Sequence, residues 1–554
     1  MTTEPSHDNC SEEAGNVGHP SADRLRSPVQ RYWPFLAILG VVAAGFAKAV
    51  TSAEFLGDDW VFLYQYRSLG LGTLLAPVNA YHMAQVSALY FSLVRILCGN
   101  SAPCFAFGNL VLHTLNTVLV LRISRCLGAG PSMSLAAAAL YGSHYLISES
   151  VFWVSGNFTL VMVTFYLLAL HTYMRALDGG RAQWPRVALA YLFGILCIFA
   201  HESGVTVFVA CLAYELVWRL DGRGSVRPSV SLGVIRGFLL RAIGAAACVS
   251  LLLLSKAVTG TRMTISEHPG VGRLPALVAD YFLRLWIPSE AGTAKITGTP
   301  ILMPVFVHFV ESPRLLAAVL LLCVFFPAAM IAWRGSLAQR FAFVWTAVAV
   351  TAVSYGAEHC QSRYFALVAA PGSLLFVTTF SAVASRVGRR FNLNEKYLRL
   401  ALVIPILYGI IHNQQVGEQY AQAGALVRRL VHSPTLLRAL HERETRRLVV
   451  LNLPDHREPR WSAVDDAYVF RNGFDMAVEL THGEHFAVKA DDVSVGRLTG
   501  YDLSRNAWTD QPELSPQALR EHIQKNDALV LQFDPERADF VVVNDRTLAG
   551  SQPP

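Results

Sequence analysis

Long apolar runs recur through the first three quarters of the chain, and polar residues gather mainly in the short connections between them. A transmembrane helix needs about 20 consecutive, predominantly apolar residues to cross a bilayer. By that measure the pattern predicts about eleven crossings. They fall near residues 33–53, 104–121, 132–152, 157–174, 187–200, 203–218, 237–257, 315–333, 341–357, 364–384 and 398–415.

Four stretches depart from this simple pattern. The runs 187–200 and 203–218 are short, so this pair is either two crossings or one broken or re-entrant helix. The stretches 60–98 and 274–310 are less apolar, and we expect interfacial helices on the outer face there.

Composition agrees with a membrane protein, since 53% of the 554 residues are hydrophobic and 16% are charged. Soluble domains carry about 25% charged residues. No nucleic-acid partner is expected. The nine cysteines lie mostly in apolar runs without metal-ligand spacing, so we expect small core residues. Only Cys98 and Cys104 are candidates for a disulfide, and the pattern does not favour one.

The distribution of Lys and Arg predicts the orientation. With the N-terminus inside, the inner segments carry 20 of these cations, whereas the outer connections 144–157 and 200–203 carry none and 357–363 carries only Arg363. The positive-inside rule therefore places the N-terminus in the cytoplasm, and an odd number of crossings places the C-terminal tail outside. Residue usage favours a bacterial source, which makes the plasma membrane the expected location.

Three parts follow from this organisation. Residues 1–32 are polar and predict a disordered cytoplasmic leader, and residues 33–415 form the membrane domain. Residues 416–554 carry 16 Lys and Arg against 21 Asp and Glu, and have β-branched runs at 448–451, 529–533 and 540–543. The predicted fold class is an all-α polytopic membrane domain with a small β-rich or α/β extracytoplasmic domain.

Two adjacent carboxylates, Asp58 and Asp59, directly follow the first apolar run. Neighbouring carboxylates repel each other and are costly to desolvate, so we expect a solvated pair that serves water, a cation or an acceptor proton. The alternative is a helix cap, because Gly-Asp-Asp is also favourable at a helix start.

Three further polar clusters fall on the same predicted outer face. Glu149 lies in one outer turn, and His201 and Glu202 lie between two apolar runs with almost no loop. His359 and Arg363 lie in another outer turn, where an Arg at a helix start indicates an anionic partner. Ionisable residues inside membranes mark functional sites by default, although each can also bond a neighbouring helix end or snorkel to the interface. The chain has no Walker loop, GxGxxG or HExxH motif.

The order of these motifs resembles the polyprenyl-phosphate-sugar-dependent GT-C glycosyltransferases, and within them the protein O-mannosyltransferase-related proteins that carry tetratricopeptide repeats. The segments that carry the resemblance are the Asp-Asp loop, Tyr81-His-Met, Phe107 to Asn116, His144 to Ala176, His201 to Thr206, and Arg363 to Pro371. The departures are His82 and His201, where the group has Arg and Lys, and Gly156 to Thr159, where it has Gly-Arg-x-Asp. The repeats themselves are missing.

The resemblance implies sugar transfer from a polyprenyl-phosphate sugar lipid to a protein or glycan acceptor. In that scheme Asp58 or Asp59 takes the acceptor proton. Arg363, with His359 or His201, holds the phosphate leaving group. Glu149 and Glu202 orient these cations or bind the sugar, and a divalent cation between the aspartates stays open. The alternatives are a secondary transporter that uses the same groups as a proton relay, and a catalytically silent scaffold.

Overall fold

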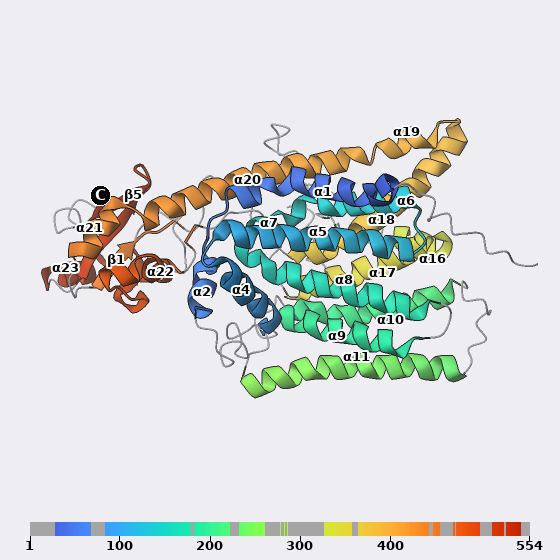
Figure 1. The fold of residues 1–554 in the computed structure, drawn as a ribbon, viewed down its shortest axis with the longest axis horizontal. Coiled ribbons are helices and arrows are strands. Elements are labelled where there is room, and N and C mark those ends of the chain that lie inside the picture. Colours follow the sequence, from blue (N-terminus) through green and yellow to red (C-terminus); the bar gives the residue numbers. More distant parts are fainter. Residues whose placement is uncertain are drawn as a thin grey trace, which may run out of the picture.

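Helices that run side by side along the long axis dominate the computed structural model (Figure 1). It describes residues 28–67, 83–178, 182–221, 232–260, 278, 282, 285, 326–356, 364–442, 447–454, 469–470, 473–498, 512–525 and 528–543. Within these residues, eight helices are long and apolar enough to cross a membrane. The chain is an integral, multi-pass membrane protein.

The long helices form one bundle. They are α1 (Pro28–Thr51), α5 (Ala102–Cys126), α8 (Asn157–Leu177), α9 (Trp184–Ala200), α10 (Thr206–Leu220), α11 (Leu232–Thr259), α17 (Leu337–Gly356), α18 (Phe365–Phe391) and α20 (Val403–Val431). The shorter helices are α2 (Asp58–Gln65), α4 (Gln85–Cys98), α6 (Pro131–Gly142), α7 (Ser148–Phe152), α16 (Phe326–Arg334), α19 (Glu395–Leu400) and α21 (Pro434–Glu442). Helices α2 and α4 lie at one end of the bundle, which we call the α2 end (Figure 1).

The predicted crossing at 132–152 is not one helix. Helix α6 ends at Gly142, and two 3₁₀ turns, η2 (Tyr145–Ile147) and η3 (Val154–Gly156), flank the short α7 before α8 begins. An apolar run does not distinguish a continuous helix from a chain of turns buried inside protein, so the pattern missed these breaks. Each break leaves backbone carbonyls without a helical partner, and hydrocarbon has no water to bind them.

Polar side chains on one face of α5 bind these carbonyls. Asn109 donates from Nδ2 to the carbonyl oxygen of Trp153 at 2.9 Å. One turn later, Nε2 of His113 lies 3.1 Å from the carbonyl oxygen of Gly142. Both side chains are fully buried. This part of the Phe107 to Asn116 motif therefore holds the interrupted segment in place.

Helix α20 packs against the same break, at Ser143. Asn413 donates from Nδ2 to the carbonyl oxygen of Ser143 at 3.0 Å. One turn earlier, Gly409 is so close that a Cβ there would collide with that carbonyl oxygen. Glycine is therefore required at this crossing by the approach of the two backbones.

Helices α1 and α20 run parallel. Gln414 donates to the carbonyl oxygen of Ala44 at 2.9 Å, and four residues later in both helices Lys48 pairs with Glu418. The start of α1 and the end of α20 consequently lie at opposite ends of the bundle, as an odd number of crossings requires. The predicted boundary at 415/416 falls inside α20, because the drop in hydropathy there does not interrupt the helix.

The tail is a small α/β domain at the α2 end (Figure 1). Its strands are β1 (Arg447–Leu451), β2 (Val493–Leu498), β3 (Glu513–Leu514), β4 (Ala528–Asp534) and β5 (Asp539–Val542), and its helices include α22 (Phe474–Phe486) and α23 (Pro516–Gln524). The sheet order is β3-β2-β1-β4-β5, with only the β4–β5 pair antiparallel. The three predicted β-branched runs are β1, β4 and β5, whereas β2 and β3 were not predicted. The predicted combination of a helical membrane domain with a small α/β domain is confirmed.

Helix α22 fastens the tail to the first loop. Tyr64 donates its hydroxyl to Glu479 at 3.1 Å, and Arg67 pairs with the same carboxylate. The backbone N–H of Gly57 donates to the carbonyl oxygen of Val469 at 3.1 Å. The first loop and the tail are therefore joined by side chains and by backbone.

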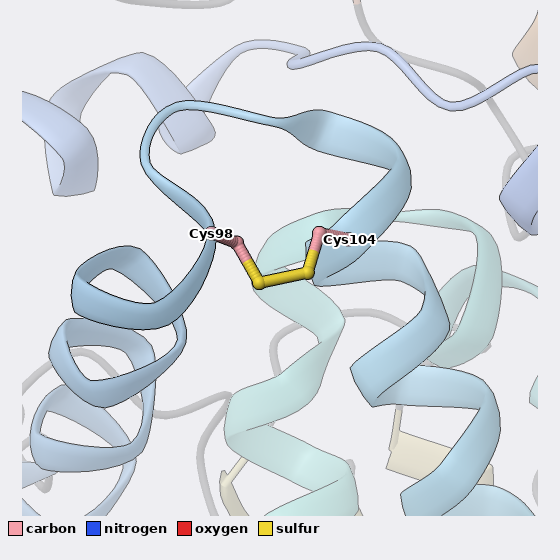
Figure 2. Close-up of a disulfide and its surroundings, with 2 residues drawn as sticks. All are labelled: Cys98 and Cys104. Atoms are coloured by element: carbon pink, nitrogen blue, oxygen red, sulfur yellow. A yellow bond between two sulfur atoms is a disulfide. The ribbon is translucent and has the colours of Figure 1, made fainter.

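The cysteine prediction is wrong for one pair, because Cys98 and Cys104 form a disulfide (Figure 2). Helix α4 ends at Cys98, and Gly99, with a φ of 61°, starts the tight turn into α5. This turn brings the two Cα atoms to 6.1 Å. The six-residue spacing alone did not show that a chain reversal lies between them.

The remaining predictions on segments have mixed outcomes. The runs 187–200 and 203–218 form two separate helices, α9 and α10, joined by the 3₁₀ turn η4 (Glu202–Val205). The stretch 60–98 contains parts of α2 and all of α4. Nearly all of the stretch 274–310, most of 315–333 and most of the N-terminal leader lie outside the described residues.

The crossing of α20 over the break yields a stability prediction. We expect Gly409→Ala to lower the thermal stability of the purified protein, because accommodating the Cβ separates two backbones at an expected cost of about 1–3 kcal/mol. The matched control is Gly40→Ala in α1, where a Cβ meets nothing within 4 Å. Melting temperatures measured in one detergent should fall for Gly409→Ala only, and equal values for both variants would contradict the close approach.

Candidate functional site

The two adjacent aspartates occupy different environments. Helix α2 begins at Asp58, whose side chain is partly exposed at the α2 end, whereas Asp59 is fully buried. Gly57 precedes them with a φ of 45°, which favours glycine at this turn. The sequence predicted one solvated pair, and the structure separates its two members.

Asp59 joins two segments that are far apart in the sequence. Its Oδ2 accepts the backbone N–H of Leu56 at 2.9 Å, and its Oδ1 accepts the backbone N–H of Ser155 at 2.8 Å together with the Ser155 hydroxyl. Burial raises the pKa of Asp59 to about 7. The expectation that Asp59 is solvated is therefore wrong. The capping alternative is also wrong, because Gly57 is the N-cap of α2 without a side-chain cap bond, and the N–H that Asp59 accepts is that of Leu56, before the helix.

Close packing at Gly156 and a hydrogen bond from Trp153 fix the turn η3, whose Ser155 binds Asp59. Gly156 lies against the backbone of Ser150, where a Cβ would collide with the carbonyl oxygen. Trp153 donates its indole N–H to the carbonyl oxygen of Leu56 at 3.3 Å. Glu149, a predicted site residue, is buried in α7 within one turn of Trp153. Ser155 was not predicted, although it lies beside the conspicuous Trp and Gly of this turn.

A second polar cluster contains Glu202, at the start of η4. Its Oε1 lies 3.1 Å from the ammonium of Lys256 and accepts the backbone N–H of Met83 at 2.9 Å. The Lys256 side chain, near the end of α11, is only 6% exposed. A cation was expected beside Glu202, but Lys256 was not among the predicted residues. Its signal in the sequence is a single Lys close to the end of the apolar run 237–257.

His201 lies directly before Glu202 and faces two neighbours. Its Nδ1 lies 2.9 Å from the hydroxyl of Ser203, and its ring meets the edge of Tyr364 with centroids 6.2 Å apart. Tyr364 follows Arg363 in the sequence. Arg363 and His359 themselves lie outside the described residues.

Helix α4 connects the two clusters. Near its start, Ser87 donates to the carbonyl oxygens of Ala200 at 3.0 Å and Phe158 at 3.3 Å, which lie at the ends of α9 and α8. Near its other end, Arg95 donates to the carbonyl oxygen of Leu63 in α2 at 3.1 Å. Both clusters therefore lie at the α2 end and share one supporting helix.

The described residues do not fit a divalent cation between the aspartates. Both oxygens of Asp59 face N–H or hydroxyl donors, whose positive ends would repel a metal ion. Among the described residues, no three His, Cys, Asp or Glu side chains form a group that could hold a metal. We therefore assign no step to a metal ion.

The two aspartates should respond differently to the same substitution. We expect Asp59→Asn to lower stability by about 1–3 kcal/mol near pH 5, because the amide replaces one acceptor and leaves a buried N–H unpaired. We expect Asp58→Asn to leave stability nearly unchanged, since its side chain is partly exposed. Thermal melts of both variants test this. Equal losses of stability would contradict the assignment of Asp59 as buried and Asp58 as partly exposed.

The pKa of Asp59 predicts a specific pH dependence. Because burial raises this pKa from 3.8 to about 7, the folded protein keeps a proton that the unfolded chain releases near pH 4. Stability therefore falls as the pH rises from about 4 to about 7, by up to about 1.4 kcal/mol per pH unit. Melting curves over this window should converge for wild type and Asp59→Asn as the pH rises. Parallel curves would show that Asp59 does not titrate there.

Curated proteins with similar sequences are protein O-mannosyl-transferases. The chain is 28% identical over 156 residues to protein O-mannosyl-transferase Tmtc2 of Drosophila melanogaster, covering 27% of this chain and 17% of that protein. It is 30% identical over 137 residues to TMTC1 of Mus musculus, covering 23% and 14%. It is 23% identical over 219 residues to TMTC4 of Homo sapiens, covering 34% and 29%. The matches thus span less than a third of each relative.

Solved structures with a similar course of the chain include ArnT from Cupriavidus metallidurans in the apo state. That match has 10% identity and a TM-score of 0.45, and covers 92% of this chain and 94% of ArnT. The Archaeoglobus fulgidus oligosaccharyltransferase matches at 13% identity and a TM-score of 0.42, covering 76% and 62%. Similarity at this level is too low to assign an activity. No protein-family model matches the chain. The resemblance to protein O-mannosyl-transferases that the motifs predict is confirmed by the curated relatives.

Proposed function

We propose that the chain is a membrane glycosyltransferase that moves a sugar from a polyprenyl-phosphate donor to a hydroxyl of a protein or glycan acceptor. The observation that carries the proposal is the arrangement at the α2 end. A partly exposed carboxylate, Asp58, and a carboxylate paired with a cation, Glu202 with Lys256, lie at the same end of a membrane bundle and share the supporting helix α4. The similarity to protein O-mannosyl-transferases supports the same class of reaction.

In the proposed reaction Asp58 is the general base. The acceptor oxygen forms a bond to the anomeric carbon and gives its proton to the carboxylate, while the bond from that carbon to the phosphate oxygen breaks. The electron pair of the broken bond stays on the phosphate. Asp59 is a positioning residue, because it holds the start of α2 against η3. Arg363, His359 and His201 remain the candidates from the sequence for binding the donor phosphate.

Two observations support catalysis on the outer face. The Cys98–Cys104 disulfide lies at the α2 end, and disulfides persist mainly in oxidising compartments. The distribution of Lys and Arg independently favours an outer location for the same loops. The donor would then enter from the outer leaflet, and the tail would be extracytoplasmic.

One buried carboxylate of the described helices, Glu215, is not suited to the proton relay of a secondary transporter. Glu215, the buried carboxylate within α10, has both oxygens occupied. Arg241 donates to one at 2.8 Å, Arg219 donates to the other at 2.9 Å, and Tyr173 donates its hydroxyl at 2.7 Å. A carboxylate bound by two guanidinium groups is held in its charged form and is poorly suited to carry protons.

The experiment that tests the function is sugar transfer by the purified protein in bilayers. Radiolabelled polyprenyl-phosphate mannose is supplied with membrane proteins and glycans as acceptors, and label in either fraction is measured. We expect Asp58→Asn to lower the rate by about 10²–10⁴-fold, the usual contribution of a general base, with an unchanged melting temperature. The control is Asp178→Asn, a half-exposed partner of Arg175 beyond the end of α8.

The possible results separate the candidate functions. Transfer by wild type and Asp178→Asn, but not by Asp58→Asn, supports the proposal. Full activity of Asp58→Asn would remove it from the site. The absence of transfer by wild type with any of several polyprenyl-phosphate hexoses would favour the silent scaffold.

A further inference from the structure

Lys256 lies on the narrow buried stripe of α11, in line with Arg241, Ala245, Cys248 and Leu252, whereas most of the helix is exposed. Its neighbours Leu253, Leu254 and Val258 are 45%, 61% and 78% exposed, whereas the Lys256 side chain is 6% exposed. A lysine near the end of a transmembrane helix ordinarily extends its ammonium to the interface, where water solvates it. This ammonium is instead directed into the protein, toward Glu202.

The surroundings of the pair differ from those of the structural ion pair in the same bundle. The Glu215 side chain is fully buried, and guanidinium and phenol groups bind both of its oxygens. The Glu202 side chain is 19% exposed, and the same oxygen that faces Lys256 also accepts the Met83 N–H. Glu202 is thus partly accessible to solvent. The Lys256 ammonium beside it lies at the α2 end rather than deep in the bundle.

We propose that Lys256 binds the phosphate of the polyprenyl-phosphate donor, and that Glu202 is its counter-ion when no donor is bound. The inference rests on the proposed function and adds a residue to it. An ammonium has three donors, so it can bind a carboxylate and a phosphate oxygen together.

The charge change during transfer explains why a lysine suits this place. The donor phosphate is a diester with one negative charge, and after the sugar leaves it is a monoester with a second negative charge. The cation therefore binds the leaving phosphate more strongly than the donor, which lowers the barrier of the step.

The test uses two variants that break the same ion pair. Lys256→Met removes the ammonium while keeping the length of the side chain, and Glu202→Gln removes the opposite charge while keeping the lysine. Binding of polyprenyl phosphate to the full chain in nanodiscs is measured by titration. We expect Lys256→Met to weaken binding roughly ten-fold or more, the usual effect of losing a charge-assisted contact, and Glu202→Gln to keep affinity within about three-fold. Lys48→Met, which breaks the half-exposed pair with Glu418, is the matched control and should bind as wild type does.

Two additional arms make the results decisive. Polyprenol without phosphate should bind equally to wild type and Lys256→Met, and inorganic phosphate should compete only weakly, since the donor's tail contributes to binding. Equal loss in Lys256→Met and Glu202→Gln would mean that the pair only stabilises the fold, and would overturn the inference. Equally strong competition by inorganic phosphate would overturn the lipid headgroup as the source.

The failure of this inference and that of the proposed function are distinguishable. If wild type binds polyprenyl phosphate and Lys256→Met binds it equally, only the role of Lys256 is overturned. If wild type does not bind polyprenyl phosphate at all, the proposed function falls with it. Should Lys256→Met not fold, the doubly neutral variant Lys256→Gln with Glu202→Gln keeps two polar groups in contact. It must show the same loss of affinity.

Discussion

The structure depends on satisfying backbone carbonyls where helices break inside a bilayer. Between Gly142 and Asn157 the chain makes two 3₁₀ turns and one five-residue helix in a region surrounded by apolar side chains. An unpaired carbonyl there costs several kcal/mol, because no water is present to bind it. Asn109 and His113 from α5 and Asn413 from α20 provide the donors. These three contacts fix the irregular segment, and α2 at the α2 end is bound to that segment through Asp59.

Because the irregular segment is fixed, η3 can present a backbone N–H and a hydroxyl to Asp59. That contact determines where α2 begins and therefore where Asp58 lies. The two neighbouring aspartates differ in environment: one is buried, with a pKa that burial raises to about 7, and the other stays partly exposed. A burial cost at Asp59 is thus the physical condition for a usable carboxylate one residue earlier. The Cys98–Cys104 disulfide holds α4 against α5, and Arg95 holds it against α2.

The sequence predicted most of the architecture because hydropathy and charge act locally. Long apolar runs became α1, α5, α8, α11, α17, α18 and α20, and β-branched runs became three strands of the tail. The breaks after Gly142 were missed because the groups that permit them lie on α5 and α20, far away in the sequence. The burial of Lys256 and of Asp59 was missed for the same reason, since each depends on a partner more than 50 residues away. Hydropathy records how apolar a segment is, and not which polar group faces which neighbour.

The tail is coupled mechanically to the site. Helix α20 extends for 29 residues, about 43 Å, from the bundle into the tail, and no break separates the two parts. On the other side, Glu479 of α22 binds Tyr64 and Arg67 around α2, and Gly473, with a φ of 81°, brings α22 close to Trp60. A side chain at Gly473 would require strain and would press on Trp60, one residue after Asp59. The tail therefore cannot shift relative to the bundle without either breaking these contacts or moving α2. Since Asp58 begins α2, any partner that displaces the tail also changes the position of the proposed general base.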